Sequence, residues 1–437
     1  MPTQVDSFDL VYIDGHHEKA ATLHYFDRLI PHLSDGCLVI FDDVHWSLGM
    51  VEAWNSFRQR KGFTCTLDLG RFGIGLWNGK DQLSGHLRPF PVYPTLGERQ
   101  TLIHETRIKL TVVIPVFNSK EQLCRCLNAL NASTRSPDQI IVVDDSSADD
   151  SATVARAQGA CVVPVTDGPR GPAVARNRGA VRATGDALVF LDADVTVHPD
   201  TLALFEKYLI EQPNIAAFFG SYDALPAGRG VVSRYKNLMH HYVHQHARRE
   251  AFTFWAGCGA IRRQVFEALG GFDERYARPS IEDIALGARL RQAGHRVWLC
   301  PDIQVTHLKE WTLGGLLLSD IRDRAIPWSR LLFRQGALPA DLNLDANSRL
   351  SALVAWLGLL ALPAGFWMPW VWALVPISIA ILLLLNIDLY RFFARHGETF
   401  FIMSAISLHI FYLFYSSAVF AVLFGVYTVA KLFKCQD

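Results

Sequence analysis

The sequence has no excess of charge of either sign. Lysine and arginine together number 42, aspartate and glutamate together also number 42, and the formal net charge is zero. A protein whose main partner is nucleic acid usually carries a strong basic excess, because it must offset the phosphate charges. The balance argues against such a function, and we expect no nucleic acid partner.

Paired cysteine motifs are also lacking. The eight cysteines are scattered along the chain, with no Cys-x-x-Cys pair and no Cys/His spacing typical of zinc ligands. This argues against a disulfide framework and against a zinc site, and we expect reduced thiols in a cytoplasmic domain. Residues 1–30 carry acidic, basic and histidine side chains throughout and no long apolar run, so we expect no secretory signal at this end.

Long apolar runs are concentrated near the end of the chain. Hydrophobic residues make up 50% of the sequence, and residues 350–387 contain no charged residue. A helix needs roughly 20 residues to cross a bilayer, so this run predicts two helices joined near residues 366–370. Residues 404–430 are again free of charge. We therefore predict a membrane domain at 336–437, with three transmembrane helices at about 350–367, 370–387 and 404–430.

Basic residues indicate an orientation for these helices. Loops rich in lysine and arginine tend to stay in the cytoplasm. We therefore expect an integral protein of the cytoplasmic (inner) membrane, with the preceding zone in the cytoplasm. The arginines that precede the first apolar run are Arg322, Arg324, Arg330, Arg334 and Arg349. A third span would leave Lys431 and Lys434 outside, against the same rule, unless the last segment is partly re-entrant.

Residues 1–85 predict a small α/β segment. Two apolar runs that reach acids, FDLVYIDG and CLVIFDDVHW, flank a helical stretch, which implies a parallel sheet, and TCTLDLGRFGIGLWNG predicts a hairpin. VYIDGHH and FDDVHW resemble the C-terminal half of a class I methyltransferase that uses S-adenosylmethionine. The resemblance implies active-site positions for Asp14, Asp42 and Asp43, and places that family's glycine-rich cofactor loop before Met1. We interpret the segment as a truncated, non-catalytic methyltransferase half, followed by a proline-containing linker at 86–107.

Residues 108–335 predict a doubly wound, mostly parallel sheet. Apolar strands such as KLTVVIPVFN, IIVVDDSS, CVVPV and LVFLDADV alternate with helical stretches. Ligands of such sheets bind beyond the carboxyl ends of the strands. Asn118, Asp145, Asp192 and Asp194 all fall at those ends, and packing does not readily explain polar residues that converge there from separate strands.

The stretch LVFLDADV places two carboxylates side by side. Side chains two residues apart in an extended chain point to the same face, so Asp192 and Asp194 raise the cost of ionising each other. A hard cation such as Mg²⁺ or Mn²⁺ offsets this repulsion, and it is commonly held by one or two carboxylates plus substrate phosphates. We therefore predict a Mg²⁺ or Mn²⁺ site with Asp192 and Asp194 as ligands. Capping of a helix is the alternative.

Further motifs accompany this pair of carboxylates. TVVIPVFN, IIVVDDSSADDS, GPAVARNRG, LVFLDADV, WAGCGAIRR, GGFDE and IEDIALGARLRQAGHRV occur in this order, and together they resemble family 2 glycosyltransferases over nearly all of residues 109–310. The resemblance implies the GT-A fold and transfer of a sugar from a nucleotide-sugar, with a metal that neutralises charge on the departing diphosphate.

The resemblance also implies roles for individual residues. Inversion needs a base on the face opposite the leaving group, and the ED motif implies Asp283 for that catalytic role, with Glu282 beside it. Capping of the following helix is the alternative for both acids. His307 is either a third metal ligand or a structural histidine. The nucleotide-sugar would be held by Pro115, Phe117, Asn118, Asp145, Arg176, Asn177 and Asp192. The acceptor pocket would contain Trp255, Gly257, Cys258, Arg324 and Trp328.

Residues 319–333 predict an amphipathic helix lying on the membrane. Arg324 and Trp328 loosely resemble the QxxRW element of processive family members, but the glutamine is absent and the spacing is longer. We therefore do not expect processive polymerisation.

These patterns together predict an inverting, metal-dependent glycosyltransferase. It would move a sugar from a nucleotide-sugar to a lipid or lipid-linked glycan acceptor at the cytoplasmic membrane face, in cell-surface glycan synthesis. One alternative is a methyltransferase that works through residues 1–85, where the glycine-rich loop is missing. The other is a non-catalytic membrane scaffold, whose sign would be loss of a carboxylate at 192, 194 or 283; all three are present.

Overall fold

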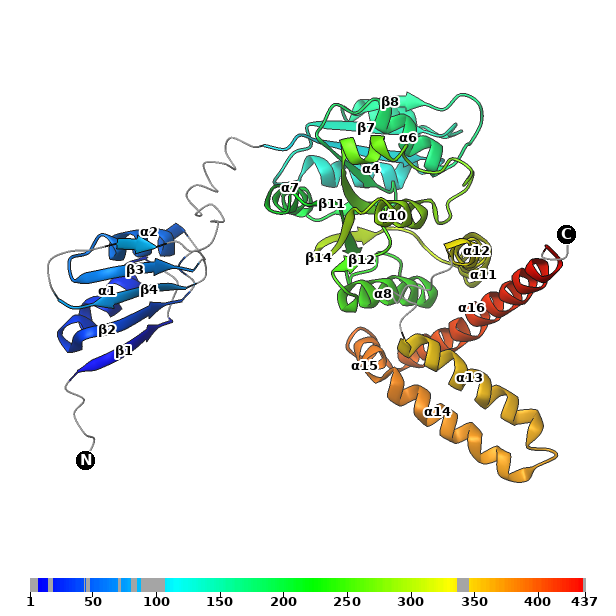
Figure 1. Ribbon diagram of the computed structural model, residues 1–437. Helices are drawn as coiled ribbons and strands as arrows, with labels where there is room; N and C mark the ends of the chain where they lie inside the picture. The colour runs from blue at the N-terminus through cyan, green and yellow to red at the C-terminus, as the bar shows by residue number, and fades with distance from the viewer. Residues whose placement is uncertain are drawn as a thin grey trace. The chain divides into compact units, whose positions relative to one another are not determined.

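The computed structural model describes residues 7–14, 19–42, 44, 48–69, 72–79, 85–87, 107–335 and 346–434. Its contacts divide the chain into two compact units, Met1–Arg107 and Ile108–Asp437 (Figure 1). Most of the expected linker, and Asp43 of the methyltransferase-like segment, lie outside the described residues. The further division of the second unit at residue 335 stays a prediction.

The first unit contains a five-stranded sheet in the order β1-β2-β4-β3-β5. The expected hairpin is confirmed, since β3 and β4 pair antiparallel. The expectation of a parallel sheet is only partly right, because β4 also runs against β2 while β1–β2 and β3–β5 are parallel. The strands are β1 (Phe8–Ile13), β2 (Leu33–Phe41), β3 (Phe63–Asp68), β4 (Gly73–Trp77) and β5 (Gly85–Leu87), with helices α1 (Lys19–Leu29) and α2 (Leu48–Arg58) and the 3₁₀ turn η1 (Ile30–His32).

Aromatic rings from α1, α2 and the strands form the core of this unit. Phe26 of α1 packs on Phe57 of α2 and on Phe63 of β3, with ring centroids 5.0 and 5.5 Å apart. Leu10, Leu38 and Leu76 are in register on three neighbouring strands and are 60%, 36% and 39% exposed. These three leucines therefore form an apolar row that the described residues leave accessible to solvent.

The second unit is built on a nine-stranded sheet in the order β10-β14-β11-β13-β9-β6-β7-β8, with β12 paired to β14. The predicted mostly parallel sheet is confirmed, with β10, β12 and β13 as antiparallel exceptions. The strands are β6 (Leu110–Val116), β7 (Gln139–Asp144), β8 (Cys161–Pro164), β9 (Ala187–Leu191), β10 (Val195–Val197), β11 (Ile215–Tyr222), β12 (Glu250–Ala251), β13 (Cys258–Arg262) and β14 (Arg296–His307).

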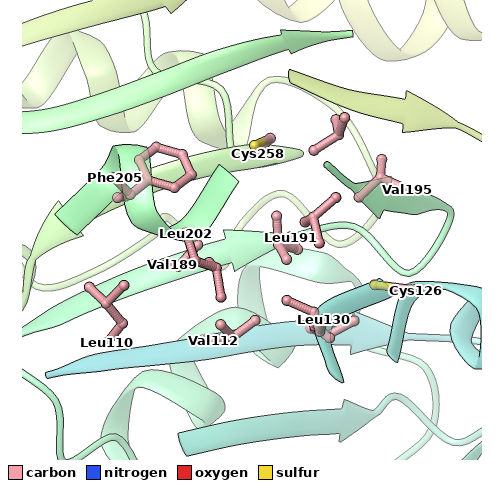
Figure 2. Close-up of a cluster of buried hydrophobic side chains, with 14 of the residues drawn as sticks. Leu110, Val112, Cys126, Leu130, Val189, Leu191, Val195, Leu202, Phe205 and Cys258 are labelled. Atoms are coloured by element: carbon pink, nitrogen blue, oxygen red, sulfur yellow. The ribbon is translucent and has the colours of Figure 1, made fainter. Parts of the chain in front are cut away.

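Helices cover both faces of this sheet, which makes it doubly wound. Leu127 of α4 and Phe205 of α7 join one buried cluster, while Ala175 of α6, Phe266 of α9 and Leu286 of α10 join the other. Figure 2 shows part of the first cluster, where α4 and α7 side chains meet those of β6 and β9. The helices are α4 (Lys120–Asn131), α5 (Ser151–Ala157), α6 (Pro172–Val181), α7 (Thr201–Glu211), α8 (Val231–His246), α9 (Arg263–Ala268) and α10 (Glu282–Gln292).

The chain after β14 is helical. Residues 319–333, expected as one amphipathic helix, form a π-helix followed by an α-helix, and Asp320 in the π-helix is buried. The elements are α11 (Leu313–Leu318), the π-helix η2 (Ser319–Ala325), α12 (Ile326–Gln335), α13 (Ala346–Ala364), the 3₁₀ turn η4 (Pro369–Ala373), α14 (Leu374–Leu385), α15 (Ile387–Arg395) and α16 (Thr399–Lys434).

Two of these helices, α13 and α16, are long and apolar enough to cross a membrane. α13 covers the first expected span only as far as Ala364, α16 contains the third, and the chain breaks between Ala364 and Pro369. The second expected span is shorter than predicted, since residues 369–385 meet α15 at a bend of 67°. A third span exists only if this bent pair is counted as one.

Helix α8, which follows β11, packs directly on this helical region. Tyr235 and Leu238 of α8 share a buried cluster with Phe393 of α15 and Phe401 of α16. Arg234 of α8 also donates a hydrogen bond of 2.8 Å to the carbonyl oxygen of His396. The sheet and the apolar helices of the second unit are therefore joined through α8.

Candidate functional site

A cavity of about 730 Å³ opens beyond the carboxyl ends of β6, β7 and β9. Its size falls within the range of small-molecule sites, roughly 300–1,000 Å³. Sequence analysis predicted twelve of its lining residues, which are Pro115, Phe117, Asp145, Arg176, Asp192, Asp194, Trp255, Glu282, Asp283, His307, Arg324 and Trp328. Residues from separate strands and helices therefore converge as the α/β fold predicts.

Arg176 connects two acidic parts of the cavity. Its guanidinium donates hydrogen bonds of 2.7 Å to Oδ1 of Asp192 and 2.8 Å to Oε1 of Glu282. The side chains of Arg176 and Glu282 are both only 5% exposed. The hydrogen bonds of this guanidinium in the structure are therefore with acids of the protein, whereas the sequence motifs predicted that Arg176 holds the nucleotide-sugar.

Asp283 lies in the first turn of α10 and faces the cavity. Its carboxylate accepts hydrogen bonds from the backbone N–H of Ile284, at 2.8 Å, and of Ala256, at 3.2 Å. Burial and the neighbouring charge of Glu282 raise the pKa of Asp283 to about 7. A carboxyl group with a pKa near neutral is suited to accept a proton during turnover.

The two carboxylates of LDAD have different surroundings. Burial, opposed by Arg176, leaves the pKa of Asp192 raised, and the charge of Asp194 adds to this effect. Burial acts in the same direction on Asp194, but the close approach of His307 and the charge of Lys309 outweigh it, so its pKa is lowered. Nε2 of His307 lies 3.6 Å from Oδ2 of Asp194. Asp194 is therefore the acid of the pair that stays ionised most readily.

These residues can contribute only part of a metal site. Among the described residues no group of three His, Cys, Asp or Glu side chains could hold a metal ion alone. Asp194 and His307 are neighbours because β10 pairs with the end of β14, and Oδ2 of Asp192 has no hydrogen-bond partner in the described part of the chain. This set fits Mg²⁺ or Mn²⁺ whose coordination a substrate phosphate completes.

The predicted nucleoside end is organised by backbone contacts. Asp145 is buried and accepts hydrogen bonds from the backbone N–H of Arg170 and Gly171, at 2.9 and 2.8 Å. Phe117 is 48% exposed and lines the cavity, so its ring is available for stacking. Asn118 does not line the cavity; it has φ +48° and its side chain accepts a hydrogen bond from the N–H of Ala148 at 2.7 Å. It thereby joins the loops that follow β6 and β7.

Three further predicted residues lie away from the cavity lining. Asn177 exchanges hydrogen bonds with the backbone of Phe272 and so holds the loop before α10. A side chain at Gly257 would meet the Trp255 ring at 2.6 Å, so glycine allows that ring to pack. The assignment of Cys258 to the acceptor pocket was wrong, because its side chain is fully buried in the core under β13 (Figure 2).

Sequence analysis missed one wall of the cavity. It consists of Lys236, Met239, His240, Val243 and His244 of α8, together with Tyr222, Lys309 and Trp311. Tyr222 stacks on His307 with centroids 4.2 Å apart and packs against His240 at 4.3 Å. The histidine-rich run MHHYVHQH in α8 was the available signal. The family-like motifs stop at LVFLDADV before this run and resume at WAGCGAIRR after it, so no motif pointed to the run itself.

Two family models match parts of this chain. The model described as Glycosyl transferase family 2 matches residues 111–270, which include Asp145, Arg176, Asp192 and Asp194. The model described as Methyltransferase domain matches residues 1–44, in the first unit. Asp283 and His307 lie beyond the first match.

Two of the curated relatives are glycosyltransferases of Mycobacterium tuberculosis and Salmonella anatum. The pre-mycofactocin glycosyltransferase of Mycobacterium tuberculosis is 30% identical over 247 residues, which cover 53% of this chain and 50% of the relative. The O-antigen chain rhamnosyltransferase WbaN of Salmonella anatum is 27% identical over 218 residues, covering 46% of this chain and 67% of the relative. The chain thus spans about half the length of the first relative and two thirds of the second.

One solved structure shows a limited similarity to this chain. The mannosyltransferase PcManGT from Pyrobaculum calidifontis, in complex with GDP-Man and Mn²⁺, gives a TM-score of 0.47 at 19% identity. The match covers 72% of this chain and 87% of that one.

Proposed function

We propose that this protein is an inverting glycosyltransferase, because the family model described as Glycosyl transferase family 2 matches residues 111–270, which carry much of the cavity. It takes a sugar from a nucleotide-sugar donor and transfers it to a lipid or lipid-linked acceptor at the cytoplasmic face of a membrane. The product contributes to a cell-surface glycan.

One observation carries this proposal. A single cavity brings Asp283, whose pKa is raised to about 7, together with the Asp192–Asp194 pair on the far side of Arg176. An inverting transfer needs these two features, a base for the acceptor hydroxyl and a site for the diphosphate that departs. Packing alone gives no reason for an acid that follows β9 and an acid at the start of α10 to meet at one arginine.

The residues account for a balanced transfer. The acceptor hydroxyl oxygen attacks the anomeric carbon and forms the new C–O bond, while its proton moves to the carboxylate of Asp283. The bond from the anomeric carbon to the diphosphate oxygen breaks, and the nucleoside diphosphate leaves with the electron pair. The backbone N–H groups of Ala256 and Ile284 hold the Asp283 carboxylate in place, and Trp255 and Trp328 bound the space for the acceptor.

Asp194, His307 and the free oxygen of Asp192 would hold a divalent cation in this scheme. When bound, Mg²⁺ or Mn²⁺ supplies charge neutralisation to the departing diphosphate. The lowered pKa of Asp194 supports its role as the ionised ligand. Phe117 and Asp145 are proposed to bind the nucleoside, the first by stacking and the second by accepting from a base N–H.

The membrane location is supported by the apolar helices. α13 and α16 meet the length and composition of spanning helices, and α8 contributes both to the cavity wall and to the cluster shared with α15 and α16. The cavity is thus tied to elements expected in the bilayer. This favours an acceptor that is itself anchored there.

The proposal is tested by donor hydrolysis. The detergent-purified protein is incubated with a panel of nucleotide-sugars in Mn²⁺, Mg²⁺ or EDTA, and released nucleoside diphosphate is measured. We expect metal-dependent release from one donor. Absence of release from every donor, combined with no nucleotide binding by calorimetry, would contradict the proposal and favour a scaffold.

A further inference from the structure

The wall that α8 contributes to the cavity carries an unusual concentration of positive charge. Lys236, Lys309 and Arg324 all line it. They come from α8, from the segment after β14 and from the π-helix η2. The three cations are close enough to affect one another, since Arg324 and Lys309 both help to lower the pKa of Lys236, after the larger effect of burial. The cavity also contains the acids of the site, and the charge of Lys309 reaches one of them, Asp194.

The charges on this wall are only partly balanced by the protein. Nζ of Lys236 donates a hydrogen bond of 2.6 Å to Oδ1 of Asp320. Within the described ranges, neither Lys309 nor Arg324 has a carboxylate partner; Lys309 lies 4.1 Å over the ring of Trp311. Asp323 also lines the cavity, but its carboxylate is held by Arg322 at 2.7 Å. Lys309 and Arg324 act on Asp194 and Asp320 through their charge, but neither cation is held by a hydrogen-bonded carboxylate among the described residues.

Two ring nitrogens of this wall also lack partners: the indole nitrogen of Trp311 is a donor, and the imidazole nitrogen of His240 donates or accepts according to its tautomer. Nδ1 of His240 and Nε1 of Trp311 are buried and have no hydrogen-bond partner among the described residues. Buried polar groups of proteins are normally paired, and unpaired ones call for an explanation such as a ligand. Cations and an N–H group without hydrogen-bonded partners are the complement of a phosphate, whose oxygens only accept.

The same wall is connected to an apolar helix. Asp320, which binds Lys236, also accepts a hydrogen bond of 2.7 Å from the hydroxyl of Tyr415 in α16. α16 is one of the two helices apolar enough to span a membrane. An anionic group bound at Lys236 would therefore lie next to an element expected in contact with lipid.

We propose that Lys236, Lys309 and Arg324 form a subsite for a phosphate group of the acceptor, and that the acceptor is a phosphorylated lipid. This inference rests on the proposed glycosyl transfer and specifies its acceptor. The subsite holds the headgroup phosphate at the basic wall, while the part of the acceptor that carries the reacting hydroxyl extends toward Asp283. The donor diphosphate binds at the Asp192–Asp194 pair.

The test measures binding of a defined lipid phosphate without the donor. Farnesyl phosphate is titrated into the full chain in uncharged detergent micelles with EDTA, which removes the divalent cation that the donor site needs. Farnesol and inorganic phosphate are titrated in parallel. We expect farnesyl phosphate to bind at least about tenfold more tightly than either, because only it combines the phosphate with a lipid chain.

Charge-removing variants then locate the binding. Lys309→Gln and Arg324→Gln should each raise the Kd for farnesyl phosphate about tenfold, a typical loss for one charge-assisted contact. Both side chains are exposed, so the fold should persist. The matched control is Lys207→Gln in α7, whose side chain is exposed and does not line the cavity. Its Kd should stay within twofold of the wild-type value.

Several outcomes would overturn the inference. One is an unchanged Kd in both variants, and another is equal binding of inorganic phosphate, which would mean a free-phosphate site only. Complete displacement of farnesyl phosphate by a nucleoside diphosphate in EDTA would assign the cations to the donor. Donor hydrolysis without farnesyl phosphate binding would defeat this inference alone. Binding of farnesyl phosphate that depends on Lys309 and Arg324, without donor hydrolysis or nucleotide binding, would instead contradict the glycosyl transfer and leave the phosphate site supported.

Discussion

Arg176 and Glu282 form a buried ion pair between positions 106 residues apart in the sequence. Their side chains meet at 2.8 Å, and each is only 5% exposed. The pair joins α6 to the first turn of α10. The same guanidinium holds Asp192 at the end of β9, so this contact sets the position of the proposed base relative to the proposed metal ligands.

Replacing Arg176 should destabilise the fold. Arg176→Met leaves the buried Glu282 carboxylate without a cation, and breaking such a pair costs about 3 kcal/mol or more in the free energy of unfolding. Thermal or urea denaturation in detergent measures the loss. Arg178→Met is the control on the same helix, since its pair with Asp167 is exposed and should contribute less than about 1 kcal/mol. Equal losses of unfolding free energy in the two variants would show that the buried pair contributes no more to stability than the exposed pair.

Asp283→Asn should abolish transfer but leave donor binding. An amide cannot accept the proton of the acceptor hydroxyl, and loss of a general base lowers kcat by roughly 10²–10⁴-fold. Product formation gives kcat, and calorimetry gives the Kd of the donor, which should stay within about threefold. Asp302→Asn, which removes a carboxylate bonded to Tyr208 outside the cavity, should match the wild type. Turnover retained by Asp283→Asn would exclude this residue as the base.

Transfer should increase as the pH rises through about 7. Burial and Glu282 raise the pKa of Asp283 to about 7, so the carboxyl is protonated and inactive below that pH and ionised above it. The profile of kcat/KM from pH 5.5 to 8.5 checks this, with near-UV circular dichroism at each pH to establish that the fold persists. A flat profile across this range would contradict the assignment of the base.

The metal requirement should depend on His307. His307→Asn removes a nitrogen ligand next to Asp194 and should raise the Mn²⁺ concentration for half-maximal donor hydrolysis about tenfold or more. His198→Asn is the control, because His198 binds Asp223 and does not line the cavity. If both variants need the same Mn²⁺ concentration as the wild type, His307 is a structural histidine.

The first unit should be dispensable for transfer. Met1–Arg107 forms a compact unit of its own, and the lining of the proposed site comes wholly from the second unit. A chain that starts at residue 108 should therefore hydrolyse donor within about twofold of the full chain. Calorimetry with S-adenosylmethionine on the full chain complements this measurement, and tight binding would revive the methyltransferase alternative.

The acidic end of the site was predictable from sequence for a physical reason. Parallel strands end on one edge of the sheet, so acids that follow separate strands are brought together by the topology itself. Asp145, Asp192 and Asp194 followed this rule. Motif resemblance supplied Asp283, which no strand pattern indicated.

Residues whose role depends on side-chain direction were not predictable. β13 lies between β9 and β11 and is buried on both faces, so its apolar sequence gives no sign of which layer Cys258 enters. The position of Lys236 depends on which face α8 turns to the cavity, and that of Arg324 depends on a π-helix. Neither feature has a recognisable period in the sequence. Lys236 is far in the sequence from Lys309 and Trp311, and only packing brings the three side chains to one wall.

Asp320 is shared between two environments, since one oxygen binds Lys236 in the cavity wall and the other binds Tyr415 in an apolar helix. A treatment that pulls α16 away from α8 thus alters the balance of charge around the ligand, even where the sheet stays intact. The choice of detergent becomes a variable of the kinetics for this reason. A soluble version cut before α16 would keep the acids of the site, yet it would differ from the whole chain in how firmly the lysine beside them is held.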